Sequence, residues 1–114
     1  MFFFLYNQLM IVIINNEKFN VDIANSFKSK LIGLMGKKNI QKGIIFFNTG
    51  SIHTFFMKEN IDILMLTKEK RIIYIKKDLM KNKIIIKPKA KYTIELPKNS
   101  IKNIQLNDLV IFEE

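Results

Sequence analysis

The stretch SIHTFFMKENIDILML, residues 51–66, is the densest apolar and aromatic part of the sequence. Its two halves predict β-strands at residues 51–57 and 61–66, because Ile, Phe and Thr pack well on a pleated surface. Between the halves, residues 58–60 read KEN, which is turn material. We therefore expect two neighbouring strands here, and a β fold around them.

Short apolar runs of the same kind continue on both sides of this stretch. Residues 10–14 and 18–23 predict a hairpin, since the Asn pair between them tolerates positive φ. Seven or eight strands at this spacing predict a small β-sandwich or a barrel-like domain. One segment has helical spacing, and it predicts a single short α-helix at about residues 26–35. The remaining predicted strands cover residues 43–47, 71–76, 83–87, 91–96 and 108–112.

Length and composition favour one soluble domain. A chain of 114 residues, 48% hydrophobic and 25% charged, is typical of a globular protein that folds around its own core. The sequence has no cysteine, which excludes disulfides, thiolate zinc sites and cysteine nucleophiles. We expect a single β domain over residues 10–114. Residues 1–9 then form a short apolar leader or an extension of the first strand.

The apolar start of the chain, MFFFLYNQLMIVII, raises the question of a targeting segment. A signal peptide needs a positively charged start, and the first lysine here is Lys18. A spanning helix needs about 20 apolar residues, and this run is shorter. We expect no transmembrane segment and a cytoplasmic protein, with weak membrane-surface association through residues 1–14 left open. Translation from Met1 or from Met10 fits the sequence equally.

The net charge of +9 indicates an anionic partner, such as nucleic acid, or simply a solvated basic surface. Ile, Lys and Asn make up 51 of the 114 residues, against a single Arg, which resembles the coding preference of an AT-rich genome. Proteins that read nucleic acids rely on clustered Arg and on aromatic side chains beside it. The composition therefore favours a solvated basic surface over a nucleic-acid site.

Two polar residues of the opening stretch are candidates for chemistry. His53 is the only histidine, so a multi-histidine metal site is excluded, and we expect no metal and no cofactor. Its imidazole can act as a general base, bind a ligand or hold neighbouring strands. Asp62 interrupts an apolar strand, and a buried carboxylate needs a donor or a cation. The candidate partners are the backbone amides of residues 58–60, Lys58, or His53, the last being an arrangement that orients imidazole.

Glu95 is a third candidate, and three interpretations stay open for it. It alternates with the apolar set of its strand, so it can lie on an exposed face, form a salt bridge or line a site. Phosphate-loop, dinucleotide, EF-hand and zinc-protease patterns are absent, as is a G-x-S-x-G elbow. We expect the phenylalanines of the apolar strands, Phe46, Phe47, Phe55 and Phe56, to be core residues.

Three blocks of the sequence resemble the family of domain of unknown function 192. They are SFKSKLIGLMG at residues 26–36, SIHTFFMKENIDILML at 51–66 and YTIELPKNSIKNIQLNDLV at 92–110. The family's pattern runs roughly as a helix ending in G-L-M-G, then H-[ST]-F-x-M-[KR], a strand with I-D, and later L-E-L-P-x-G and G-D. The resemblance places His53, Thr54, Phe55, Met57, Lys58, Asp62, Glu95, Leu96, Pro97 and Asp108 at signature positions.

This sequence departs from the family at three glycine positions, which here are Asn99, Asn103 and Asn107. Asn is the commonest residue besides glycine in left-handed backbone conformations, so we expect the same turns. The family's function is not established, so the resemblance implies a fold more than a mechanism.

We expect an uncharacterised protein that binds a small ligand or a peptide at a polar site around His53, Lys58 and Asp62, with Glu95 nearby. One alternative is a protein-interaction or cationic scaffold domain, and another is an enzyme that uses His53 with Asp62. No catalytic motif is recognisable, which favours binding over catalysis. The partner is then an unknown small molecule or peptide, and the sequence does not predict an oligomeric state.

Overall fold

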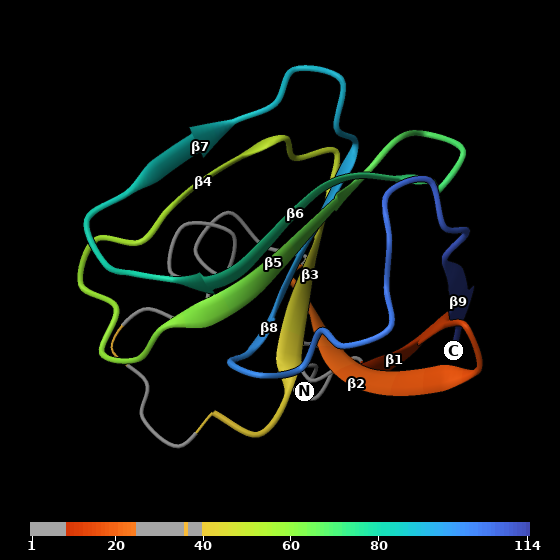
Figure 1. Ribbon diagram of the computed structural model, residues 1–114, viewed down its shortest axis with the longest axis horizontal. Helices are drawn as coiled ribbons and strands as arrows, with labels where there is room; N and C mark the ends of the chain where they lie inside the picture. Colours follow the sequence, from red (N-terminus) through yellow and green to blue (C-terminus); the bar gives the residue numbers. More distant parts are fainter. Residues whose placement is uncertain (1–8, 25–35, 37–39) are drawn as a thin grey trace, which may run out of the picture.

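The computed structural model describes residues 9–24, 36 and 40–114, and it is mainly β (Figure 1). Within these residues it has nine strands and no helix, and the helix expected at about residues 26–35 lies outside them. The mainly β prediction is therefore confirmed. The strands are β1 (Leu9–Ile14), β2 (Glu17–Ala24), β3 (Gly43–Phe47), β4 (Ser51–His53), β5 (Ile61–Leu66), β6 (Ile72–Leu79), β7 (Ile84–Ile86), β8 (Tyr92–Pro97) and β9 (Ile111–Glu113).

Seven strands form one curled sheet in the order β6-β5-β8-β3-β2-β1-β9, which we call the main sheet. All neighbours are antiparallel except β2 and β3, which run parallel. Asn15 and Asn16 join β1 to β2 with φ of 52° and 68°, as the predicted hairpin requires. Two of the three asparagines at family glycine positions, Asn99 and Asn107, also have positive φ, whereas Asn103 does not.

The segment after β8 closes the curl of the main sheet. It runs back to the edge of β6, where the backbone N–H of Ile72 donates to Asp108 O (3.1 Å) and that of Val110 donates to Lys70 O (2.9 Å). The chain then enters β9, which pairs with β1 at the opposite end of the sheet. The result is a half-barrel closed by its own C-terminal segment.

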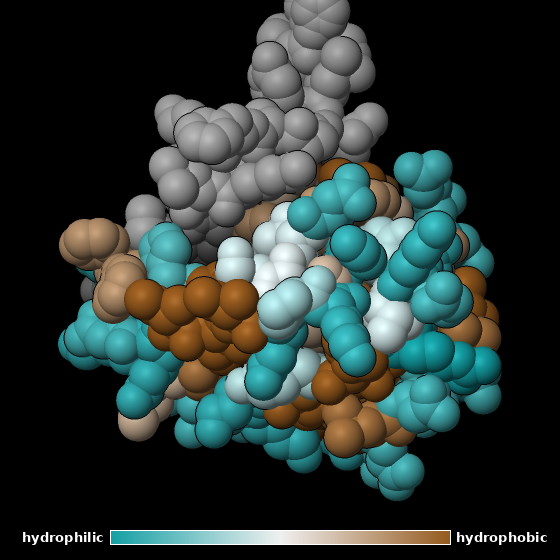
Figure 2. Space-filling model, turned by 90° about the horizontal axis from the view of Figure 1, so that it is seen from above, coloured by the Kyte–Doolittle hydropathy of each residue, from teal (hydrophilic) through white to brown (hydrophobic). Residues whose placement is uncertain are grey.

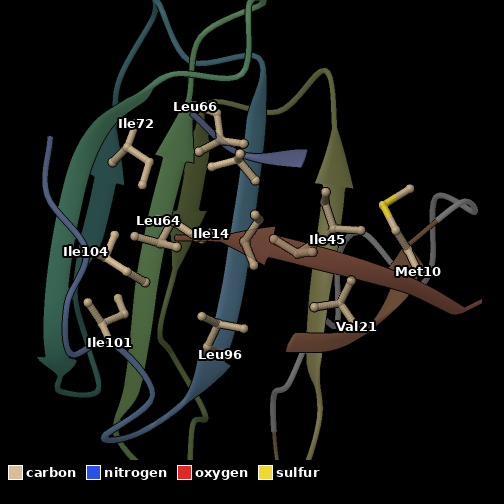
Figure 3. Close-up of a cluster of buried hydrophobic side chains, with 13 residues drawn as sticks. Met10, Ile14, Val21, Ile45, Leu64, Leu66, Ile72, Leu96, Ile101 and Ile104 are labelled. Atoms are coloured by element: carbon tan, nitrogen blue, oxygen red, sulfur yellow. The ribbon is translucent and has the colours of Figure 1, made fainter. Parts of the chain in front are cut away.

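The inside of this half-barrel is the larger core, and every strand of the main sheet contributes side chains to it, β9 through the partly buried Phe112. Figure 3 shows Leu64, Leu66 and Leu96 on the same side of the ribbon as Ile45 and Ile14. Full burial of each such side chain stabilises the fold by roughly 1.5–3 kcal/mol. The closing segment adds Ile101, Ile104 and Val110 to the same cluster.

A second layer covers the other face of the main sheet. β4 and β7 pair with each other as a two-stranded antiparallel sheet, which we call the small sheet. Its inward residues Ile52 and Ile85 pack against a second buried cluster that includes Ile63, Met65 and Phe46. All six residues of β5 are buried, because core lies on both faces of that strand.

The strand expected at residues 51–57 ends at His53, so that prediction was too long. The chain turns there, and Phe56 has φ of 66°, which no regular strand allows. Phe55 and Phe56 are 37% and 76% exposed, so their assignment to the core was wrong. Phe46 is buried, as expected.

Candidate functional site

Asp62 is buried, and its side chain joins separate backbone segments by hydrogen bonds. Its carboxylate accepts hydrogen bonds from three backbone N–H groups: Asp78 to Oδ1 (2.9 Å), and Ser100 and Ile101 to Oδ2 (2.9 and 3.0 Å). These bonds join β5 to β6 and to the segment that closes the half-barrel. The prediction that Asp62 needs backbone or charged donors is met by amides far along the chain, rather than by those of residues 58–60.

Glu95 lies on the opposite face of the main sheet from Asp62. Residues directly across from each other in neighbouring strands share a face. Glu95 is paired with Ile63 and Ile44, which belong to the cluster under the small sheet, whereas Asp62 is paired with Leu96 in the other core. Glu95 is buried, so the exposed-face interpretation was wrong. The fold does not bring the two carboxylates together.

His53 and Lys58 belong to the small sheet and the turn that follows it. The His53 ring is half-buried and stacks on Phe55, with ring centroids 5.4 Å apart. Its Nδ1 accepts a hydrogen bond from the backbone N–H of Phe55 (3.2 Å), so a neutral ring carries its proton on Nε2. Lys58 is exposed in the turn. These two predicted site residues lie on the small sheet's side of the main sheet, and Asp62 points to the other.

Thr54 fixes the end of β4. Its side chain is buried, and Oγ1 donates to Met80 O (2.7 Å) and accepts from the backbone N–H of Lys83 (2.8 Å). The backbone N–H of Thr54 also donates to Lys83 O (2.9 Å). Thr54 thereby holds the turn after β4 against the loop that leads into β7.

The outer face of the small sheet carries exposed apolar side chains. Ser51 pairs with Ile86 and His53 with Ile84, so these four residues share that face. Ile84 and Ile86 are 62% and 65% exposed. Figure 2, seen from above, shows a brown apolar patch bordered by teal hydrophilic side chains. A contiguous exposed apolar patch rimmed by polar residues is typical of an interaction surface.

β7 is also an edge strand. Among the described residues, its only strand partner is β4, and Figure 1 shows it at the outer side of the fold. The segment around it is strongly basic: residues 79–94 contain five lysines and no Asp or Glu. The lysines are Lys81, Lys83, Lys87, Lys89 and Lys91.

Two further findings concern metals and membranes. Within residues 9–24, 36 and 40–114, no three His, Asp or Glu side chains gather closely enough to hold a metal ion. The same part of the chain has no helix that is long and apolar enough to cross a membrane.

Comparison with known sequences decides the family. The chain matches the sequence profile of domain of unknown function 192, described as "Uncharacterized ACR", over residues 10–110. It belongs to this family. Curated relatives are uncharacterised too: UPF0127 proteins of Thermococcus sibiricus, 30% identical over 101 residues, and of Thermococcus kodakarensis, 29% identical over 94 residues. The alignments cover 82% and 77% of this chain, and 66% and 60% of those relatives.

Two solved structures share the fold of this member of the domain of unknown function 192 family. One is a protein of unknown function from Novosphingobium aromaticivorans, with a TM-score of 0.73 and 14% identity over 90% of this chain and 83% of that one. The other, from Sinorhizobium meliloti, is described as a proposed transcription regulator, with a TM-score of 0.78 and 16% identity over 91% and 92%. At these identities the similarity shows the fold alone.

Sequence reasoning missed the outer face of the small sheet. It predicted a strand at residues 83–87 correctly but gave no reason to place Ile84 and Ile86 at the surface. The available signal was the spacing of the lysines, since Lys83 and Lys87 flank the three isoleucines directly. Charged residues that bracket a short apolar strand are typical of an edge.

Proposed function

We propose that this protein is a binding domain that takes up an extended peptide along the edge of β7 that has no strand partner among the described residues. The observation that carries the proposal is the exposure of Ile84 and Ile86, 62% and 65%, on an edge strand. Addition of a strand to an exposed sheet edge is a recurring mode of peptide recognition, in which backbone hydrogen bonds supply affinity and alternate side chains supply specificity.

The register of the small sheet leaves the right backbone groups available. The hydrogen-bonded pairs next to each end of the ladder are Lys83 with Thr54 and Lys87 with Gly50. Because such pairs alternate along an antiparallel ladder, the N–H and C=O groups of Ile84 and Ile86 point away from β4. A peptide strand can therefore form up to about four backbone hydrogen bonds there, two at each residue.

The charge of the segment selects an acidic peptide. Five lysines and no carboxylate in residues 79–94 favour Asp or Glu side chains that alternate with the apolar ones facing Ile84 and Ile86. A second copy of β7 is a poorer partner. Antiparallel self-pairing centred on Ile85 would set Lys83 opposite Lys87, and like charges directly opposite are destabilising.

The residues predicted from sequence take different parts in this proposal. His53 shares the outer face with Ile84, and Nε2–H is a donor for a polar group of the peptide. Lys58 adds positive charge in the turn after β4. Asp62 supports the scaffold, since its oxygens accept backbone bonds on the other face of the main sheet. Glu95 lies beneath the small sheet, with no part in the surface itself.

Fluorescence anisotropy with short labelled peptides tests the proposal. A peptide of alternating Val and Glu should bind, whereas alternating Val and Lys should not. N-methylation of the amides that face β7 should abolish binding, because those amides can no longer donate. The double substitution Ile84→Ser and Ile86→Ser should weaken binding at least about tenfold, since it removes the apolar contacts.

Ile73→Ser is the matched control, because Ile73 is an exposed isoleucine on β6 outside the small sheet. It should leave the affinity unchanged. Equal binding of the two peptides, or indifference to both N-methylation and the Ser substitutions, would contradict strand addition at β7.

A further inference from the structure

We infer that a hollow at one end of the small sheet is a binding site for a small organic acid. The hollow has a volume of about 310 Å³ and lies between the loop from β3 to β4 and the loop from β7 to β8. Binding sites for small molecules have volumes from about 300 Å³ upwards, so this one suits a compact molecule. It adjoins the surface proposed above for a peptide and shares Ser51 and Ile86 with it, but Ile84 lies outside the hollow.

The backbone around the hollow is preorganised. Lys87 N–H donates to Gly50 O (2.7 Å), and Thr49 N–H donates to Lys91 O (3.2 Å), so the two loops are joined at both ends. Lys91 N–H also donates to Leu66 O (2.8 Å), which anchors the second loop to buried β5. A Cβ on Gly50 would clash with Lys87 O, so the loops approach each other closely. Loops that are already joined before binding lower the entropic cost of binding.

The polar groups of the lining select an anion. The polar residues of the lining are Lys87, Lys91, Asn48 and Ser51, and among the described residues no Asp or Glu lines the hollow. Lysines in the lining without a neighbouring carboxylate favour a ligand of negative charge. The Lys87 ammonium lies 4.6 Å from the centre of the Tyr74 ring, which does not line the hollow, so Lys91 is the lysine left to meet a ligand there.

The apolar part of the lining favours a ligand that has a hydrocarbon part as well as a charged group. Ile86 and Pro88 line the same hollow, so a short hydrocarbon skeleton can contact them while its carboxylate meets Lys91. Inorganic phosphate offers the charge without the skeleton. The arrangement therefore fits a mono- or dicarboxylic acid of a few carbons better than an inorganic anion.

The test is an NMR titration of the full chain with glutarate, with its neutral analogue glutaramide and with inorganic phosphate. Glutarate should shift the backbone amides of Gly50, Ser51, Lys87 and Lys91 in a saturable way. Glutaramide should not, because it lacks the charge, and phosphate should bind more weakly. Lys91→Gln should lower the glutarate affinity at least about tenfold, through loss of one charge-assisted contact.

Lys76→Gln is the control for charge, because Lys76 is an exposed lysine on β6 whose loss changes the net charge equally. It should leave the affinity for glutarate intact. The inference is overturned if shifts spread over many surface lysines without saturation, if Lys76→Gln and Lys91→Gln act alike, or if phosphate binds as tightly as glutarate. Ile84→Ser alone separates this site from peptide binding, since Ile84 belongs to the proposed peptide surface and does not line the hollow. It should leave the affinity for glutarate unchanged.

Discussion

At the scale of single residues, Asp62 shows why a carboxylate occurs in an otherwise apolar strand. The register between β5 and β6 shifts between Ile61 and Ile63, and a bulge of this kind leaves a backbone N–H without its ladder partner. Asp78, which has φ of 55°, is the residue whose N–H then donates to Asp62. The second carboxylate oxygen satisfies Ser100 and Ile101 on the closing segment. One side chain therefore completes the hydrogen bonding of two irregular segments.

This role predicts a large loss of stability in Asp62→Asn. The amide keeps the shape but replaces one acceptor oxygen with a donor, so at least one buried N–H faces another donor. Bonds to charged groups contribute about 1.5–3 kcal/mol each, and we expect the free energy of unfolding at neutral pH to fall by about 2–4 kcal/mol. Chemical denaturation followed by circular dichroism measures it.

Asp22→Asn is the matched control for Asp62→Asn. Asp22 forms a partly exposed ion pair with Lys42 (3.2 Å), and such pairs contribute about 0–1 kcal/mol. If both substitutions lower the free energy of unfolding by the same small amount, the hydrogen bonds of Asp62 are not what holds the closing segment on the half-barrel.

At the scale of elements, the small sheet depends on Thr54 for its attachment. Thr54→Val is isosteric but removes the acceptor for Lys83 N–H and the donor to Met80 O. We expect a loss of about 1–3 kcal/mol and faster hydrogen exchange of the Lys83 amide, measured by NMR. Thr54→Ser keeps the hydroxyl and should preserve protection of that amide. Protection that survives in the Val variant would show that other contacts hold the loop.

The strand predictions were correct where the local sequence pattern alone decides the structure. Residues 61–66 are apolar except for Asp62, and β5 has those bounds because core covers both its faces. Residues 51–57 read as one strand for the same local reason. The strand ends early because Thr54 bonds to Met80 and Lys83, which are 26 and 29 positions away in sequence. Local periodicity carries no information about such partners.

For the candidate site, too, the sequence predicted the local requirement but not the distant partners that meet it. The sequence shows that Asp62 needs donors, and the structure supplies them from residues 16, 38 and 39 positions away. The sequence also predicts that Glu95 lies near Asp62 at one polar site, and the structure does place them in neighbouring strands. Which face each takes depends on the register between β5 and β8, and a one-residue change of register would reverse it.

At the scale of the whole molecule, the two layers should differ in local stability. The main sheet has seven strands, and its inner core includes the closing segment. The small sheet has two strands, and an isolated two-stranded pair is marginally stable in water. What holds it is the packing of Ile52 and Ile85 and the bonds of Thr54. We therefore expect it to open while the half-barrel stays folded.

Native-state hydrogen exchange measures this difference. The amides of Thr54 and Lys87, which donate across the small sheet, should exchange at least about tenfold faster than those of β5 and β8, a difference of about 1.4 kcal/mol in opening free energy. The opening free energy should depend weakly on denaturant concentration for the small sheet, because its opening exposes little surface. It should depend strongly on denaturant for the half-barrel, whose opening exposes more. Identical opening free energies would mean that the layers unfold as one unit. A small sheet that opens separately is also the part that an added peptide strand would stabilise most, because a third strand supplies what a two-stranded pair lacks.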